Sequence, residues 1–238
     1  MTDSAMPVLG LIVPPADGQV PPEGPALYDG RVRFIARGLA LAAIHPEGFD
    51  AVEGRIVDLA RALKAAGAQA LSLMGTSLSF YRGATFTEDL RARMAAATDL
   101  PCTTMSHAIV RSLRQLGVRR VAVATAYIDT LNERLARYLE GEGFEVTAVR
   151  GLAMTGVEAV GQVEAGTLVE LAGRVCADGR PDGLLISCGG LRTLDLHPRL
   201  ERELGLPVTS SSPAGFWDLM RTAGLDAASP GHGRLFDA

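Results

Sequence analysis

The sequence contains little cysteine and little histidine. Three cysteines and four histidines occur among its 238 residues. An odd, small number of cysteines does not suit a disulfide framework and is typical of proteins of the reducing cytoplasm. No histidine has a cysteine or a carboxylate at the spacing of metal ligands, so we expect no metal site. The four histidines are His45, His107, His197 and His232.

Charge of one sign is not concentrated anywhere in the chain. The 23 basic and 27 acidic side chains give a net charge of −4, without a cluster of lysine or arginine. This balance argues against nucleic acid or an anionic membrane as a partner. The longest apolar stretches, residues 6–15 and 38–44, fall well short of the roughly 18 residues that a spanning helix needs. Because no signal peptide is visible either, we expect a cytoplasmic protein.

Several common catalytic motifs are also missing. The chain has no Walker A sequence, no G-x-G-x-x-G after its first predicted strand, and no G-x-S-x-G. These absences argue against a nucleotide phosphate site and against hydrolases with a nucleophile elbow. The composition, 47% hydrophobic and 21% charged, is that of a globular protein with a sizeable core.

Short apolar runs alternate with longer segments of helical periodicity. This pattern predicts parallel βαβ units with right-handed crossovers, and therefore an α/β fold. The predicted strands are 8–13, 70–74, 101–105, 121–126, 144–149, 183–187 and 207–210. The predicted helices are 52–66, 87–98, 109–116, 130–140, 166–177, 198–204 and 214–223.

The two halves of the chain resemble each other. The strands that begin at Val8 and Val121 are 113 residues apart, and so are Gly75 and Cys188, which each follow a buried strand. Similar buried strands could arise by chance, but a shared offset at two landmarks favours a duplication. We expect two similar, pseudo-symmetric lobes, residues 1–118 with 208–238 and residues 119–207. Each would be a short parallel sheet flanked by helices, with the active site in the cleft between the lobes.

Cys188 is the strongest candidate for chemistry. It stands between the predicted strand 183–187 and two glycines, which let the backbone turn sharply and direct N–H groups at a ligand. A thiol at this point is suited to act as a nucleophile or as a proton donor to carbon. The alternative is a buried structural thiol, the commoner fate of a free cysteine and our interpretation of Cys102 and Cys176.

Hydroxyl groups occupy the equivalent turn of the first half. Gly75, Thr76 and Ser77 could form a neutral oxyanion nest, although serine and threonine are also ordinary turn residues. Tyr127 ends the predicted strand 121–126 and either donates a hydrogen bond into the cleft or packs at the lobe edge. The serines at 210–212 are interpreted as a helix cap rather than an anion site.

Four segments carry a resemblance to a known family. Residues 74–83 (MGTSLSFYRG), 124–129 (ATAYID), 187–191 (SCGGL) and 210–217 (SSSPAGFW) resemble the arylmalonate decarboxylases of the aspartate/glutamate racemase superfamily. The resemblance runs from Gly10 to Phe236. It implies decarboxylation, without a cofactor, of α-aryl or α-alkenyl malonates to one enantiomer, R, by a monomer whose partner is a small dicarboxylate.

The resemblance also implies roles for individual residues. Cys188 resembles the proton donor, and one carboxylate would lie in a dioxyanion hole. The hole would comprise Thr76, Ser77, Tyr127 and Gly189, beside Gly75. The apolar pocket for the departing carboxylate would comprise Pro14, Leu41, Ile44, Phe49, Val157 and Val160. Phe49 and Val160 replace the tyrosine and methionine expected there, which affects substrate shape and rate.

Two alternative functions can be distinguished from decarboxylation by the number of thiols that they need in the site. A racemase or cis–trans isomerase of the same superfamily needs thiols on both faces of its substrate, and Gly75 occupies the place of the first one. A non-catalytic carboxylate-binding protein would have no use for a thiol at the centre of an anion nest.

Overall fold

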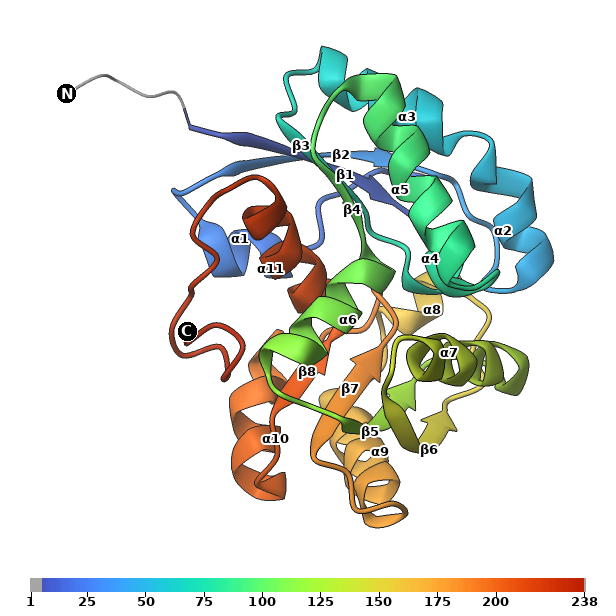
Figure 1. Cartoon of the computed structure of the whole chain (residues 1–238), viewed down its shortest axis with the longest axis vertical. Coiled ribbons are helices and arrows are strands. Elements are labelled where there is room, and N and C mark those ends of the chain that lie inside the picture. The colour runs from blue at the N-terminus through green and yellow to red at the C-terminus, as the bar shows by residue number, and fades with distance from the viewer. Residues whose placement is uncertain (1–5, 238) are drawn as a thin grey trace.

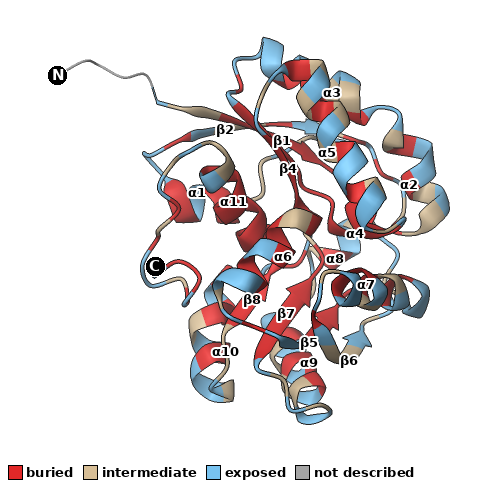
Figure 2. Ribbon diagram, viewed as in Figure 1, coloured by how far each residue is buried: buried red, intermediate tan, exposed pale blue. Residues whose placement is uncertain are grey.

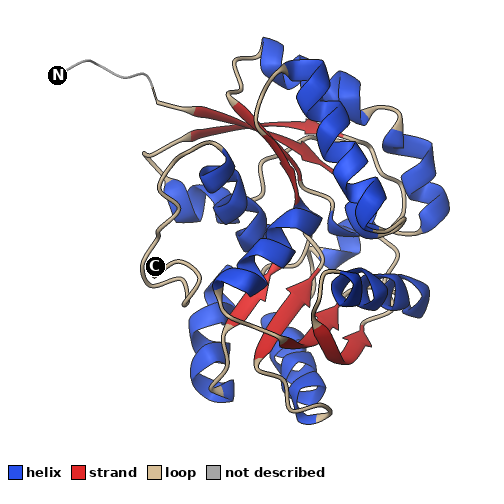
Figure 3. Cartoon of the chain, in the orientation of Figure 1, coloured by secondary structure: helices blue, strands red, loops and turns tan. Residues whose placement is uncertain are grey.

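The computed structural model describes residues 6–237 and contains two four-stranded parallel sheets (Figures 1 and 3). Their strand orders, β2-β1-β3-β4 and β6-β5-β7-β8, are the same. The first sheet is formed by β1 (Val8–Val13), β2 (Arg33–Gly38), β3 (Ala70–Leu73) and β4 (Cys102–Thr104). The second is formed by β5 (Arg120–Thr125), β6 (Glu145–Gly151), β7 (Gly183–Ser187) and β8 (Val208–Ser210). The predicted two-lobed α/β class is confirmed.

The central strands explain why the sequence folds into sheets covered on both faces. Leu9 and Leu11 of β1 pack in one buried cluster, whereas Ile12 packs in the other. Because alternate residues of a strand point to opposite faces, both faces of β1 are buried, as its unbroken apolar run predicts. In contrast, β2 lies at the edge of its sheet and carries arginines at 33 and 37, so its sequence has no such run and did not predict a strand.

Helices flank both sheets. In the first lobe they are α1 (Glu23–Tyr28), α2 (Pro46–Glu53), α3 (Ile56–Ala65), α4 (Thr76–Phe80) and α5 (Ala84–Thr98). In the second they are α7 (Asp129–Gly141), α8 (Val157–Val160), α9 (Ala165–Ala177), the 3₁₀ helix η1 (Leu194–Leu196) and α10 (His197–Leu204). The single helix predicted over 52–66 is wrong. Gly54, a weak helix former, and Arg55 separate α2 from α3.

Two helices hold the lobes together. α6 (Met105–Gln115) and α11 (Ser211–Thr222) pack against each other, and both contact strands of both sheets. α11 is buried from Ser211 to Met220 (Figure 2). This double coverage fixes the lobes relative to one another, as a catalytic cleft between them requires.

The expected lobe boundary at residue 208 differs from the observed sheets. β8 pairs with β7, so the second sheet extends to Ser210, three residues beyond the expected end of that lobe. The helix α11, which begins at Ser211, packs on α1, β3 and β4 as well as on the second sheet. Residues 1–5 and 238, which the expected boundaries also include, lie outside the described residues. None of the helices in the described part is long and apolar enough to cross a membrane.

Candidate active site

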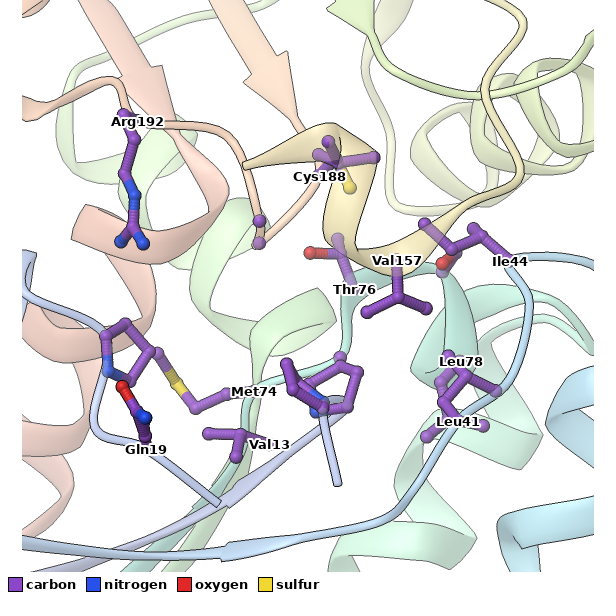
Figure 4. A pocket seen from close by; sticks show the side chains of 18 of the residues that line it. Val13, Gln19, Leu41, Ile44, Met74, Thr76, Leu78, Val157, Cys188 and Arg192 are labelled. Atoms are coloured by element: carbon purple, nitrogen blue, oxygen red, sulfur yellow. The ribbon is translucent and has the colours of Figure 1, made fainter. Parts of the chain in front are cut away.

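The carboxyl ends of four strands converge on one cleft. Segments that follow β1, β3, β5 and β7 line a cavity of about 210 Å³ between the lobes. The two turns related by the 113-residue offset both contribute to it, through Gly75 and Cys188. Figure 4 shows the thiol of Cys188 next to Thr76 in this view, at the upper edge of the side chains that line the cavity. The location predicted from the strand pattern is therefore where the cleft lies.

Cys188 has an unusual backbone and a protected thiol. Its φ of 154° lies in a region that favours glycine, and such conformations cost of order 1–3 kcal/mol and cluster at functional sites. Its N–H donates to Ser211 Oγ at 3.2 Å, and its carbonyl accepts from Leu191 N–H at 3.1 Å. Burial raises the pKa of the thiol to about 11. Cys188 is therefore a protonated acid at neutral pH.

The glycines after Cys188 allow neighbouring segments of both lobes to approach this turn closely. A Cβ on Gly189 would lie 2.9 Å from Met105 Sδ and 3.2 Å from the Met74 carbonyl oxygen. A Cβ on Gly190 would lie 3.1 Å from Val160 Cγ1. A side chain at position 189 would therefore collide with the turn of the first lobe. Glycine leaves its backbone exposed to a ligand in the cleft.

Side-chain hydrogen bonds to backbone carbonyl groups hold the turn at Thr76 in place. Ser79 Oγ donates to the Gly75 carbonyl at 3.0 Å, and Ser106 Oγ donates to the Thr76 carbonyl at 3.1 Å. Thr76 is 2% exposed, and its hydroxyl lies 2.7 Å from Met105 Sδ, a weak acceptor. Since the first N–H groups of a helix lack intrahelical acceptors, those at the start of α4 are available to an anion. The Thr76 hydroxyl can therefore donate to a carboxylate, which is a stronger acceptor than the methionine sulfur.

Tyr127 brings a phenol to the same place. It is 1% exposed, and Ser187 Oγ donates to its hydroxyl at 3.4 Å. Its backbone is held by Thr125, whose Oγ1 accepts from the Tyr127 N–H at 3.1 Å. Burial raises the pKa of Tyr127 well above its usual value, further helped by the nearby Cys188. The phenol therefore stays protonated and keeps its donor.

One end of the cleft is apolar. Leu41, Ile44 and Val157 line it, with Leu78 beside them (Figure 4). Val160 belongs to the same lining. The wall crosses between the lobes, because a backbone bridge joins residues 43 and 156. Pro14 lines the cleft as well. The structure therefore places five of the six expected apolar residues in the cavity.

Phe49 is the exception, and its expected place in the pocket is wrong. Its side chain is fully buried, and its ring packs edge-on against Tyr81 with the centroids 5.1 Å apart. Phe49, on α2, belongs to the same buried core as Leu41 and Ile44 and is not among the residues that line the cavity. Its effect on substrate shape is therefore indirect.

The opposite end of the cleft is lined by the proline-rich segment that follows β1, which the sequence predicts as a loop on the cleft side, and by Arg192, which the sequence did not single out. Arg192 faces that segment from the second lobe. The lining there comprises Pro15, Asp17, Gln19, Val20, Pro21, Pro22, Gly190 and Arg192, with Val13 and Met74 deeper in. The position of Arg192, four residues after Cys188 in the same turn, was the one sequence signal for it.

The remaining sequence candidates lie outside the cleft. Cys102 is buried in β4, and its Sγ lies 3.3 Å from the Leu100 carbonyl. Cys176 is half-buried in α9. Of the serines at 210–212, Ser210 is the N-cap residue of α11, but its hydroxyl makes no capping bond and instead contacts Thr193 and His197. Within residues 6–237, no three His, Cys, Asp or Glu side chains gather to hold a metal.

Glu23 of α1 anchors the loop that follows Cys188. Glu23 is 6% exposed, and its Oε1 accepts from the backbone N–H groups of Thr193 at 2.8 Å and Leu194 at 3.1 Å. Thr193 Oγ1 also donates to it at 3.3 Å. One carboxylate oxygen thus ties the first lobe to the loop of the second.

Glu23→Ala is expected to lower the free energy of unfolding by about 3 kcal/mol. Buried N–H groups would lose their acceptor, and each such loss costs about 1–3 kcal/mol. Urea unfolding followed by circular dichroism measures this effect. Glu23→Gln keeps an acceptor oxygen and should lose less than half as much. Equal stability of Glu23→Ala and the unaltered chain would contradict the anchoring role.

Comparison with known proteins agrees with this geometry. A model of the arylmalonate decarboxylase family matches residues 9–236. The chain belongs to the arylmalonate decarboxylase family. It is 56% identical over 239 residues to the arylmalonate decarboxylase of Bordetella bronchiseptica, covering 100% of this chain and 99% of that protein. A maleate isomerase of Nocardia farcinica is 32% identical over 244 residues, covering 95% and 94% of the two chains.

Solved structures give the same relationship. The liganded form of an arylmalonate decarboxylase with one glycine changed to cysteine and one cysteine to serine matches with a TM-score of 0.95. It is 56% identical and covers 98% of this chain and 99% of that one. A maleate isomerase of Pseudomonas putida S16 matches with a TM-score of 0.91 at 23% identity, covering 98% and 99%, and shows the shared fold. The resemblance noted in the sequence is confirmed.

Proposed function

We propose that this chain is a carboxy-lyase that decarboxylates α-aryl malonates, or α-alkenyl malonates, to a single enantiomer of the product acid. The observation that carries this proposal is the single buried thiol of Cys188 beside neutral hydrogen-bond donors, in a cleft with one apolar end. The arylmalonate decarboxylase of Bordetella bronchiseptica, at 56% identity, supports the choice of substrate.

In the first step, one malonate carboxylate binds to the donors and the other enters the apolar end. The bond from the α-carbon to the second carboxylate breaks, CO₂ leaves, and the electron pair moves onto the first carboxylate as an enediolate. Thr76, Ser77, Tyr127 and the Gly189 N–H would bind this extra charge more strongly than they bind the substrate. The apolar wall of Leu41, Ile44, Val157 and Val160 favours neutral CO₂ over a carboxylate.

In the second step, the Cys188 thiol gives its proton to one face of the planar α-carbon. The enediolate becomes the product carboxylate, and the resulting thiolate regains a proton from water. Since the other face has Gly75 and no acid, only one enantiomer forms, R by family resemblance. The steps balance without a metal or an organic cofactor, so we propose that none is used.

We further propose that the protein acts as a monomer in the cytoplasm. The monomeric state is what the family resemblance implies. Its three cysteines are all free, which suits a reducing compartment. Its partner is then only the small dicarboxylate substrate, with no nucleic acid and no membrane.

The direct test of the function is to mix the protein with phenylmalonate in the presence of EDTA. CO₂ and phenylacetate should be released in equal amounts. Maleate, offered in parallel, should give no fumarate, because the isomerase chemistry of the superfamily needs a second thiol where Gly75 stands. The proposal fails if no aryl or alkenyl malonate releases CO₂.

Tyr127→Phe is expected to lower kcat by about 10²-fold by removing one donor to the enediolate. The ring would still fill its buried site against Phe80, whose centroid lies 5.9 Å away. Steady-state kinetics with phenylmalonate measure the effect. A change confined to KM would mean that the phenol binds only the ground state. Tyr138→Phe, also buried but outside the cleft, is the matched control and should leave kcat unchanged.

The pH profile should report the raised pKa of Cys188. The protonated thiol is the active form, so activity is retained below its pKa of about 11 and lost as the pH rises through that value. We expect kcat to change by less than about twofold between pH 7 and pH 10. A thiol at the ordinary value of 9.0 would be about 90% deprotonated at pH 10. A tenfold fall in kcat by pH 10 would therefore contradict the role of a buried thiol as the acid.

A further inference from the structure

Arg192 lies at the mouth of the cleft, at the end opposite the apolar wall. Figure 4 shows Arg192 and Gln19 on one side of the cavity and Leu41, Ile44 and Val157 on the other, with Cys188 between them. Arg192 is the only cationic side chain in the cavity lining, and its side chain is exposed. A cation is thus held at a distance from the reacting groups, where the proposed reaction has no use for it.

The backbone at this position is rigidly held. The neighbours Leu191 and Thr193 are 1% and 2% exposed. Leu191 N–H donates to the Cys188 carbonyl, and Thr193 N–H donates to Glu23. The loop therefore fixes the Cα of Arg192 relative to the thiol, and only its side chain is free to adjust. Because its backbone is fixed, the guanidinium group of Arg192 can occupy only a limited region at this end of the cleft.

The charge of Arg192 is not used elsewhere in the structure. Ion pairs within residues 6–237 engage arginines such as Arg31 and Arg111, but not Arg192. Asp17 also lines the mouth and is exposed, yet it does not pair with Arg192. The guanidinium and the nearby Gln19 amide therefore keep their donors for a ligand.

The space between Cys188 and Arg192 suits a flat ring. Residues of the proline-rich segment 14–22 and the glycines at 189 and 190 form walls of this space. These walls are largely apolar until Asp17, Gln19 and Arg192 at the outer end. If the departing carboxylate lies against Leu41 and Ile44, an aryl group on the α-carbon would project into this slot. Its far edge would then point toward Arg192.

We propose that Arg192, with Gln19, recognises an anionic or hydrogen-bond-accepting substituent at the far edge of the aryl ring. The preferred substrates would be α-aryl malonates that carry such a group, for example a ring carboxylate, rather than unsubstituted ones. This inference rests on the proposed decarboxylation. It adds a specificity site at the outer end of the cleft that is separate from the dioxyanion hole.

The test compares phenylmalonate with (4-carboxyphenyl)malonate in the unaltered chain and in Arg192→Gln. The unaltered chain should show a higher kcat/KM for the ring-carboxylated substrate. Arg192→Gln should lower that preference by about fivefold to tenfold. This loss lies between the contribution of an exposed ion pair and that of a buried hydrogen bond to a charged group. Its kcat/KM for phenylmalonate should change by less than twofold. Arg192→Lys should restore part of the preference, because the charge remains.

Two further variants separate recognition from general attraction of anions. Arg199→Gln on α10 makes the same charge change outside the cleft and should not alter the preference. Asp17→Asn removes the opposing charge at the mouth and should raise it. An equal loss for both substrates in Arg192→Gln would mean that Arg192 only steers dianions, and the inference would be wrong. If the unaltered chain released no CO₂ from either substrate, the proposed function itself would fail.

Discussion

Cys188→Ser is expected to lower kcat by about 10²–10⁴-fold without disturbing the fold. A hydroxyl is a far weaker acid than a thiol, and delivery of a proton to carbon contributes about this much to a rate. Serine is slightly smaller, and its backbone can keep the bond from residue 188 N–H to Ser211 Oγ. The measurement is kcat with phenylmalonate, with thermal unfolding of the variant recorded in parallel.

Cys102→Ser is the matched control for this variant. It makes the same chemical change at another buried cysteine, which lies outside the cleft. Its kcat should equal that of the unaltered chain. Turnover of Cys188→Ser near the level of this control would mean that another group delivers the proton.

Gly75→Cys combined with Cys188→Ser is expected to invert the product enantiomer. Gly75 and Cys188 follow equivalent strands of the two facing lobes, so a thiol at 75 would approach the α-carbon from the other side. The backbone permits this residue, since Gly75 has a φ of −125° and a ψ of 96°. Its Cβ would lie 3.3 Å from Leu78 Cβ, which requires a small adjustment.

The product of the single variant Gly75→Cys should be less enantiomerically pure, because an acid then lies on each face of the enediolate. It should also racemise 2-phenylpropionate slowly, with one thiolate removing the α-proton and the opposite thiol returning one. The raised pKa of Cys188 leaves little thiolate at neutral pH, so this racemisation should speed up as the pH rises.

Chiral chromatography of 2-phenylpropionate, formed from 2-methyl-2-phenylmalonate, measures these outcomes. The unaltered chain and the double variant should give opposite enantiomers. The same enantiomer from both would show that the two turns do not flank the substrate.

The sequence predicted the parts of the fold that depend on local patterns. Buried central strands such as β1 and β5 are continuous apolar runs, and the glycines after Cys188 mark a turn at a strand end. The expected positions of Thr76, Ser77 and Tyr127 in one cleft followed from the rule that parallel strands end at the same edge. Their proposed roles came from family resemblance.

Other features depend on tertiary contacts that no local pattern shows. The family resemblance implied that Phe49 lines the cavity, but in the structure its ring, on α2, packs against Tyr81. The bonds from Glu23 to Thr193 join residues 170 positions apart. No local pattern distinguishes Arg192 from other exposed arginines, because its place in the cleft depends on the proline-rich segment that lines the same cavity.

The most direct test of the account is the decarboxylation of 2-methyl-2-phenylmalonate in D₂O by the unaltered chain after dialysis against EDTA. We predict one CO₂ per molecule consumed and 2-phenylpropionate that is a single enantiomer, R, with one deuterium on its α-carbon. This result follows if one protonated cysteine faces one side of an enediolate. A racemic product, or no CO₂ without added metal, would contradict it.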